Sequence, residues 1–282
     1  MLSDDPELKP QFRMPRVFGA LPGPRNVPAS RRGLRNNQHS MSLLVSFDTD
    51  GDALAQLLPP GCQLDGPPVV TVSLTYLSSI GWLAGRGYSI LVVGFPIRHT
   101  TASGEVLLGK FVPVVWENLA DPIITGRDEL GWSKLYADIP PAVIVGDGYH
   151  GRALWDGFKF FDIAVRDAQE APLLQPAMEG SFHYKYVPTT GGGGSADVDY
   201  LEYAPPGVSA TGYGGMEITR TLRGTGSVAF HRAAWEDVPF QYPIINALAS
   251  LPVKGTTNAW VTFASAGAAI GDPSPGALRK IP

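Results

Sequence analysis

Residues 117–139 have the sequence Glu-Asn-Leu-Ala-Asp-Pro-Ile-Ile-Thr-Gly-Arg-Asp-Glu-Leu-Gly-Trp-Ser-Lys-Leu-Tyr-Ala-Asp-Ile. Asp121 is suited to the N-cap of a helix, Pro122 to its first helical position, and Gly131 to the left-handed residue that ends it. Lys134 follows this glycine and lies between Trp132 and Tyr136. The stretch therefore predicts a short helix that ends just before a lysine in apolar, aromatic surroundings.

Strand patterns lie on both sides of this helix. They are rich in Val, Ile, Thr and aromatic residues, and the 33 Gly and 26 Pro of the 282-residue chain provide many turns between them. The expected strands are 42–47, 69–77, 88–97, 106–116, 141–145, 149–155, 158–166, 182–188, 198–203, 216–222, 228–232 and 260–264, and two further helices are expected over 51–58 and 243–251. The sequence thus predicts an α+β fold that is predominantly antiparallel β, with a few short helices.

The chain is expected to divide into an N-terminal arm and one domain. Residues 1–40 are rich in arginine and proline and have little hydrophobic periodicity, which indicates an extended segment laid over the domain or over a neighbouring subunit. Residues 41–282 are interpreted as a single domain, since no internal repeat occurs in them. Gly191–Gly194 is interpreted as a loop between two strands.

Composition excludes several classes of function. Hydrophobic residues at 44% and charged residues at 17% are typical of an ordered globular protein. The formal net charge of −4, without a basic run, argues against nucleic acid as a partner. Cys62 is the only cysteine, which excludes an internal disulfide and favours a reducing compartment. With neither a signal-peptide core nor a long apolar stretch, we expect a cytoplasmic protein without membrane contact.

Familiar catalytic motifs are absent from the sequence. The five histidines and one cysteine show no His-x-His, His-Glu-x-x-His or paired-Cys spacing, so we expect no metal site. There is no Gly-x-Ser-x-Gly, and no dinucleotide fingerprint follows a strand and opens a helix. We therefore expect no cofactor, and lysine chemistry remains as the principal candidate.

Lys134 is the candidate nucleophile. Burial among apolar side chains disfavours the charged ammonium and lowers the pKa of a lysine. A neutral amine attacks ketones and oxo acids and forms a Schiff base with them. The alternative is a surface lysine just beyond the helix, where its charge complements the helix dipole.

Four segments together resemble a known family. Gly126–Lys134 resembles the Gly-Arg-Glu-x-x-Gly-Phe-Pro-Lys segment of the acetoacetate decarboxylase superfamily. Phe47–Asp50 with Leu57–Pro59 is similar to its first strand and helix, Tyr184–Pro188 to its Lys-x-Ile-Pro strand, and Leu251–Val253 to its closing motif. The similarity extends from about residue 40 to residue 265. It implies a cone-like and a barrel-like sheet around a buried pocket, with Lys134 as the Schiff-base lysine.

The chain departs from the decarboxylase pattern at several positions. Leu135 stands where the decarboxylases have a second lysine, so burial must carry most of the pKa shift of Lys134. Asp48 occupies the position of an expected arginine, and Thr75 and Ile90 occupy those of two expected glutamates. These departures favour a divergent member, and relatives in the superfamily use the same lysine for aldol condensation, dehydration or cyclisation of pyruvate-like oxo acids.

Three further polar residues are candidates for acid–base catalysis or substrate binding. Glu117 is the nearest acidic residue before the helix, and a solvated carboxylate at a strand end is the alternative. Arg127 is suited to hold a substrate carboxylate or, equally, to form a structural ion pair. Glu236 is a more distant candidate acid. Candidate pocket residues are Tyr88, Thr75, Ile90, Trp132 and Tyr136.

The sequence thus predicts a homo-oligomeric lyase that binds a small-molecule oxo acid through Lys134. Decarboxylation of a β-keto acid ranks first by a narrow margin. The second candidate is an aldolase-dehydratase or cyclase acting on pyruvate-like oxo acids with the same lysine. The third is a non-catalytic binder of a small apolar carbonyl ligand.

Overall fold

The computed structural model describes residues 12–25, 27–31, 37–175, 179–206, 216–266 and 278–281. Its α-helices are α1 (Gly51–Ala55), α2 (Ala120–Leu130) and α3 (Tyr242–Ala249). The strands are β1 (His39–Asp48), β2 (Cys62–Leu64), β3 (Val69–Ile80), β4 (Arg86–Thr100), β5 (Val106–Glu117), β6 (Lys134–Tyr136), β7 (Val143–Val145), β8 (Gly148–Trp155), β9 (Phe158–Ala171), β10 (Gly180–Pro188), β11 (Ala196–Ala204), β12 (Met216–Phe230), β13 (Gly255–Ala266) and β14 (Arg279–Ile281).

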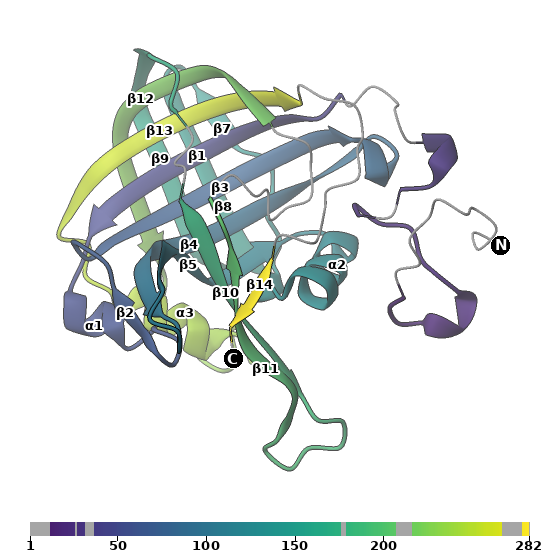
Figure 1. Ribbon diagram of the computed structural model, residues 1–282. Helices are drawn as coiled ribbons and strands as arrows, with labels where there is room; N and C mark the ends of the chain where they lie inside the picture. Colours follow the sequence, from purple (N-terminus) through teal and green to yellow (C-terminus); the bar gives the residue numbers. More distant parts are fainter. Residues whose placement is uncertain are drawn as a thin grey trace.

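All these strands belong to one curved 14-stranded sheet (Figure 1). Its order is β14-β11-β10-β5-β4-β3-β1-β13-β12-β9-β8-β7, with β2 paired to β4 and β6 paired to β5 off this path. The pairs are antiparallel except that β6 and β10 run parallel to β5. The prediction of a mainly antiparallel β fold with a few short helices is confirmed.

Strand β12 is longer than the sequence predicted. Residues 216–222 and 228–232 were expected as two strands, whereas β12 is continuous and pairs with both β13 and β9. The pairing with β9 shifts register between Arg223 and Thr225. A side chain at Gly224 would collide with the backbone carbonyl oxygen of Arg166, so the glycine allows the two strands to approach at this irregularity.

The helix ends differ in part from the predicted ones. Asp50 caps α1 as expected, since its carboxylate accepts hydrogen bonds from the backbone N–H groups of Asp52 and Ala53, but α1 ends at Ala55 rather than at residue 58. Helix α2 has Leu119 at its N-cap, so the prediction of Asp121 there is wrong. Pro122 lies inside the first turn, where its missing N–H is tolerated because that group has no helical partner. Gly131 ends α2 with a φ of 71°, as predicted.

The core holds the end of β5 firmly. Trp116, Phe95, Phe160 and Phe182 are among the largest fully buried side chains. The Trp116 indole N–H donates a buried hydrogen bond to Gln241 Oε1 at 2.6 Å, which ties β5 to the beginning of α3. Glu117, the next residue, therefore starts from a fixed position.

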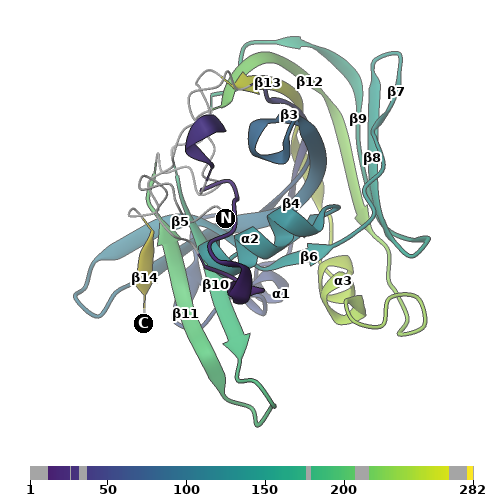
Figure 2. The same cartoon turned by 90° about the vertical axis from the view of Figure 1, so that its right-hand side faces the viewer.

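The N-terminal segment lies against α2 (Figure 2). We call residues 12–25 the strap. Arg13 and Arg25 both pair with the Glu129 carboxylate, and Arg25 also donates to the Thr125 carbonyl oxygen at 3.0 Å. The predicted arm of residues 1–40 is described only at 12–25, 27–31 and 37–40, and its separation from the 41–282 domain stays a prediction.

Candidate active site

A small βαβ unit brings the candidate residues together. Strand β5 ends at Glu117, α2 follows, and Gly131 turns the chain so that β6 runs parallel beside β5 with Lys134 opposite Val115. Residues two apart on a strand point to the same face, so Glu117 points to the same face as Val115. Lys134, which is opposite Val115, points to that face as well. The segment 117–134 therefore brings its first residue, Glu117, and its last residue, Lys134, together on one face of the sheet.

Lys134 and Glu117 form a buried ion pair. The Lys134 side chain is 7% exposed and that of Glu117 is 0% exposed. Lys134 Nζ donates to Glu117 Oε1 at 2.7 Å and to the Pro122 carbonyl oxygen at 3.1 Å. Glu117 Oε2 has no hydrogen-bond partner among the described residues. One carboxylate oxygen is thus free to interact with a bound molecule.

Burial pushes both groups toward their neutral forms. The pKa of Lys134 is lowered by desolvation, and the nearby Arg25 cation lowers it further, while Glu117 opposes the shift. The pKa of Glu117 is raised by desolvation, and Lys134 opposes that shift. Since the two groups are 2.7 Å apart, one proton transfer converts the ion pair into an amine and a carboxylic acid.

The cavity at this pair is small. Its volume is about 20 Å³, which is enough for about one water molecule. It is lined by residues of the strap, β4, β5, α2, β6 and the segment between α2 and β6, namely Pro24, Arg25, Tyr88, Ile90, Glu117, Pro122, Thr125, Gly126, Leu130, Trp132 and Lys134. An oxo acid is larger than this space, so its entry requires movement of the lining.

Gly126 provides the room for the Lys134 side chain. A Cβ atom built at Gly126 would lie 2.6 Å from Lys134 Nζ and would also collide with the lysine methylenes. Any larger residue at this turn of α2 would therefore displace the lysine. The glycine in the predicted helix thus has a packing reason at the site itself.

Most of the predicted pocket residues do lie at the cavity. Tyr88, Ile90 and Trp132 line it. Lys134 Nζ lies 5.2 Å from the centroid of the Trp132 ring. Thr75 is opposite Ile90 across β3 and β4, but its hydroxyl is hydrogen-bonded to that of Ser42 at 2.8 Å, and it does not line the cavity.

Other candidates lie elsewhere. Tyr136 is 46% exposed, and its hydroxyl donates to Asp138 Oδ1 at 2.6 Å. Glu236 is exposed in the turn before α3 and is not among the residues around Lys134. Arg127 donates from Nη1 to the Lys134 carbonyl oxygen at 2.9 Å, so it holds the backbone of the lysine rather than the cavity.

Sequence reasoning missed Arg25. It lies in the strap, is 6% exposed, and contributes a positive charge at the lysine cavity. Residues 1–40 gave no periodic pattern that would place an arginine near Lys134. Asp48, where an arginine was expected, is the last residue of β1 and does not line the cavity.

Neither a metal site nor a membrane span is found in the described part of the chain. No group of three or more His, Cys, Asp or Glu residues there is arranged to hold a metal ion. No helix in the same residues is long and apolar enough to cross a membrane.

A family model for acetoacetate decarboxylase matches residues 20–263. The match spans well over half of the chain, and the chain belongs to the acetoacetate decarboxylase family. The matched region begins in the strap and includes Arg25, Glu117 and Lys134. A search of curated proteins finds no match.

Solved structures share the fold at low sequence identity. One solved structure of acetoacetate decarboxylase is 15% identical to this chain, with a TM-score of 0.63, and the match covers 88% of this chain and 90% of that one. The acetoacetate decarboxylase of Legionella pneumophila is 17% identical, with a TM-score of 0.61 and coverages of 89% and 91%. The enduracididine biosynthesis enzyme MppR, in complex with pyruvate, is 15% identical, with a TM-score of 0.58 and coverages of 84% and 91%.

Proposed function

We propose that the protein is a carbon–carbon lyase that binds an oxo acid as a Schiff base on Lys134, with decarboxylation of a β-keto acid as the favoured reaction. The observation that supports this most is the buried Lys134–Glu117 pair, with its 2.7 Å contact and its unpaired carboxylate oxygen. A lysine that is desolvated and can pass its proton to a neighbour is an activated nucleophile, and acetoacetate decarboxylase is itself a known example of such a lysine.

The first half of the reaction forms the iminium. The Lys134 ammonium passes one proton to Glu117, and the neutral amine attacks the carbonyl carbon of the substrate. A proton moves from nitrogen to the new alkoxide, giving a carbinolamine. Glu117 then returns its proton to the hydroxyl, water leaves, and the protonated imine forms beside a carboxylate again. The net change is one C=N bond formed and one water released.

The second half breaks the carbon–carbon bond. The electron pair of the bond to the carboxylate moves into the iminium, CO₂ leaves, and a neutral enamine remains. The enamine carbon takes a proton from water that has entered with the substrate, and the hydroxide left behind adds to the iminium carbon. The resulting carbinolamine breaks its C–N bond to release the ketone and the Lys134 amine, which takes up one proton from solvent to restore the ion pair with Glu117. The apolar walls Tyr88, Ile90 and Trp132 favour loss of CO₂, because negative charge becomes dispersed in that step.

Aldolase-dehydratase or cyclase chemistry on a pyruvate-like oxo acid is the second candidate. It needs the same lysine but not the decarboxylase pattern from which this chain departs at Thr75, Ile90 and Leu135. The MppR structure, which holds pyruvate, has a TM-score close to those of the decarboxylases. A carrier that binds a small carbonyl compound without turnover is the third candidate.

Trapping with borohydride tests the proposal. The protein is incubated with acetoacetate or pyruvate, reduced with borohydride, and its intact mass is measured. We expect one adduct with wild type and with Lys185→Ala, and none with Lys134→Ala. If no adduct forms, or if the adduct persists in Lys134→Ala, both enzyme candidates fail and the carrier remains.

Product analysis separates the two enzyme reactions. Decarboxylase activity releases CO₂ from acetoacetate, whereas aldolase-dehydratase activity yields an unsaturated acid from pyruvate and an aldehyde. CO₂ without a condensation product would refute the second candidate, and the reverse would refute the first.

Homo-oligomerisation and a cytoplasmic location stay predictions. Light scattering that shows a monomer would contradict the prediction of a homo-oligomer.

A further inference from the structure

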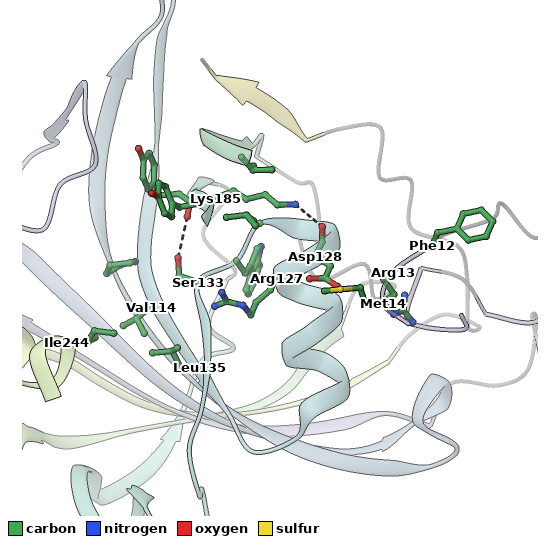
Figure 3. A pocket seen from close by; sticks show the side chains of 17 residues that line it. Phe12, Arg13, Met14, Val114, Arg127, Asp128, Ser133, Leu135, Lys185 and Ile244 are labelled. Carbon is green, nitrogen blue, oxygen red and sulfur yellow. Dashed lines mark hydrogen bonds between the residues drawn. The ribbon is translucent and has the colours of Figure 1, made fainter. Parts of the chain in front are cut away.

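A second, larger pocket lies next to the lysine cavity and shares Trp132 with it. Its volume is about 680 Å³, which is in the range of small-molecule sites. It is formed by the strap, β5, the end of α2, the segment after α2, β10, β11 and α3 (Figure 3). We call it the outer pocket. Neither Lys134 nor Glu117 lines it, and the proposed lyase chemistry makes no use of it.

Cations dominate the charged part of its lining. The charged side chains are Arg13, Arg127, Lys185 and Asp128. Arg13 is committed to Glu129 through an ion pair. Arg127 extends from the last turn of α2 toward Ser133 and Leu135 (Figure 3).

The two remaining cations, Arg127 and Lys185, donate their described hydrogen bonds to backbone carbonyl oxygens. Arg127 donates from Nη1 to the Lys134 carbonyl oxygen at 2.9 Å, and Lys185 Nζ donates to the Asp128 carbonyl oxygen at 2.7 Å. A guanidinium has five N–H donors and an ammonium has three, so these contacts orient the two groups and leave donors for an anion. No ion pair joins either cation to a carboxylate among the described residues.

The rest of the lining is mostly apolar or aromatic. Trp132, Tyr184, Leu135 and Val114 are partly or fully buried and face the pocket together with Ile244. Trp132 is fixed by stacking on the His183 ring, with the ring centroids 4.4 Å apart. A ligand for this pocket therefore needs an apolar body of aromatic size and a negative group.

We propose that the outer pocket is a binding site for an amphipathic carboxylate, an acid with an aryl or branched alkyl group. Arg127 and Lys185 supply the positive charge that attracts the carboxylate, and Trp132, Leu135 and Val114 contact the apolar part. The site does not depend on the Schiff-base function, because Lys134 takes no part in it. A bound acid would still contact two neighbours of the lysine, since Arg127 holds the Lys134 carbonyl and Trp132 lines both cavities.

Calorimetric titration with 3-phenylpropionate tests the site, with 3-phenylpropanamide as the uncharged probe of the same shape. We expect saturable binding of the acid to the full chain and binding of the amide weaker by about tenfold or more, as expected for loss of a charge-assisted hydrogen bond. Arg127→Gln and Lys185→Gln should each weaken the acid by a similar factor. Lys134→Ala should bind it as wild type does.

Controls keep the result interpretable when a variant is poorly folded. Lys254→Gln removes an exposed cation that does not line the outer pocket, so the affinity for the acid should be unchanged. Arg127→Lys keeps the charge and should bind the acid with intermediate affinity. Thermal unfolding identifies variants that lose structure. Equal affinity for acid and amide would overturn the proposal. So would unchanged binding in the folded Arg127→Gln and Lys185→Gln variants, or no saturable binding at millimolar acid.

Discussion

At the scale of single residues, Gly126 decides whether Lys134 fits beneath α2. A methyl group there would overlap the lysine methylenes and the amine. Alanine normally stabilises a helix by about 1 kcal/mol relative to glycine, whereas overpacking a filled site costs about 1–3 kcal/mol. The collision involves the part of the lysine that is fixed by Glu117 and Pro122, so the cost should exceed the gain.

The first prediction concerns this contact. Gly126→Ala is expected to lower the free energy of unfolding by about 1 kcal/mol or more and to slow borohydride trapping strongly. Urea unfolding and the adduct yield at a fixed time measure the two effects. The double variant Gly126→Ala/Lys134→Ala is the control, because removal of the lysine chain relieves the overlap. If Gly126→Ala alone is more stable than wild type and traps substrate normally, the packing argument is wrong.

The second prediction separates adduct formation from turnover. Glu117→Gln removes the group that raises the pKa of Lys134, so the amine is expected to be neutral over a wider pH range and to remain trappable. Turnover should fall by about 100-fold or more, because the acid–base group that speeds iminium formation is lost, whereas the slowly formed imine still accumulates to a trappable amount during a long incubation. Mass spectrometry after reduction and steady-state assays give the two readouts. Equal loss of both, with an intact fold, would contradict separate roles.

Residue-level reasoning reaches furthest where the sequence itself places groups close together. Lys134 and Glu117 are separated by only one helix, so short-range patterns named both as candidates, but the ion pair between them was not predicted. Arg25 is brought in by a segment without periodicity, and its contact with Glu129 spans 104 residues of sequence. Likewise, Tyr136 was expected in the pocket wall, but a hydrogen bond to Asp138 accompanies its exposure.

At the scale of elements, the strap determines how closed the lysine cavity is. Pro24 and Arg25 form part of its lining, and the strap is held on α2 through Glu129, which pairs with both Arg13 and Arg25. The Glu129 side chain is 14% exposed and the two arginines are less exposed still, so these ion pairs are weakly screened by solvent. One carboxylate thus fixes two points of the strap.

The third prediction follows from this arrangement. Glu129→Gln is expected to loosen the strap, to speed reductive trapping of small oxo acids by Lys134, and to lower stability by about 3 kcal/mol, because two buried cations lose their partner. Trapping rate and thermal unfolding measure these effects. Asp128→Asn, on the neighbouring exposed residue of α2, is the matched control. A trapping rate in Glu129→Gln equal to or below that of wild type would show that the strap does not limit access.

Element boundaries were predictable where a side chain or a glycine acts locally. Asp50 does so at the start of α1 and Gly131 at the end of α2, both as expected. The start of α2 was predicted at Asp121, yet Leu119 lies at the N-cap and caps no backbone group with its side chain. The start of α2 follows directly from the end of β5 at Glu117, and a rule that considers only capping side chains does not predict it.

At the scale of the whole molecule, fold class followed from turn-separated strand patterns, but strand order did not. β5 lies between β4 and β10 in the sheet and also pairs with β6. Residues of β5 and β10 that pair with each other are about 70 residues apart in the sequence. This long-range pairing buries His183 of β10 beside Trp132, and it places Glu202 of β11 opposite His183. Neither residue was predicted to matter, since each lies in an ordinary strand pattern.

Burial of His183 gives the whole molecule a dependence on pH. The ring nitrogens have no hydrogen-bond partner among the described residues, and burial lowers the pKa of His183 from 6.5 to about 3, with a smaller contribution from Lys134. Below pH 6.5 the unfolded chain binds a proton that the folded chain does not bind. This group therefore makes stability fall as pH decreases from 6.5 toward 3, and its effect is absent above 6.5.

The fourth prediction uses His183→Phe, which keeps a ring stacked on Trp132 and removes the titration. Between pH 7 and pH 5 wild type should lose up to about 2 kcal/mol of unfolding free energy through this histidine, and the variant should not. Urea unfolding at both pH values gives the difference. His39→Gln, at an exposed histidine, should retain the pH dependence of wild type. If His183→Phe shows the same acid destabilisation as wild type while remaining folded, His183 is protonated in the native protein, and its enclosure between β10 and the segment after α2 is looser than described.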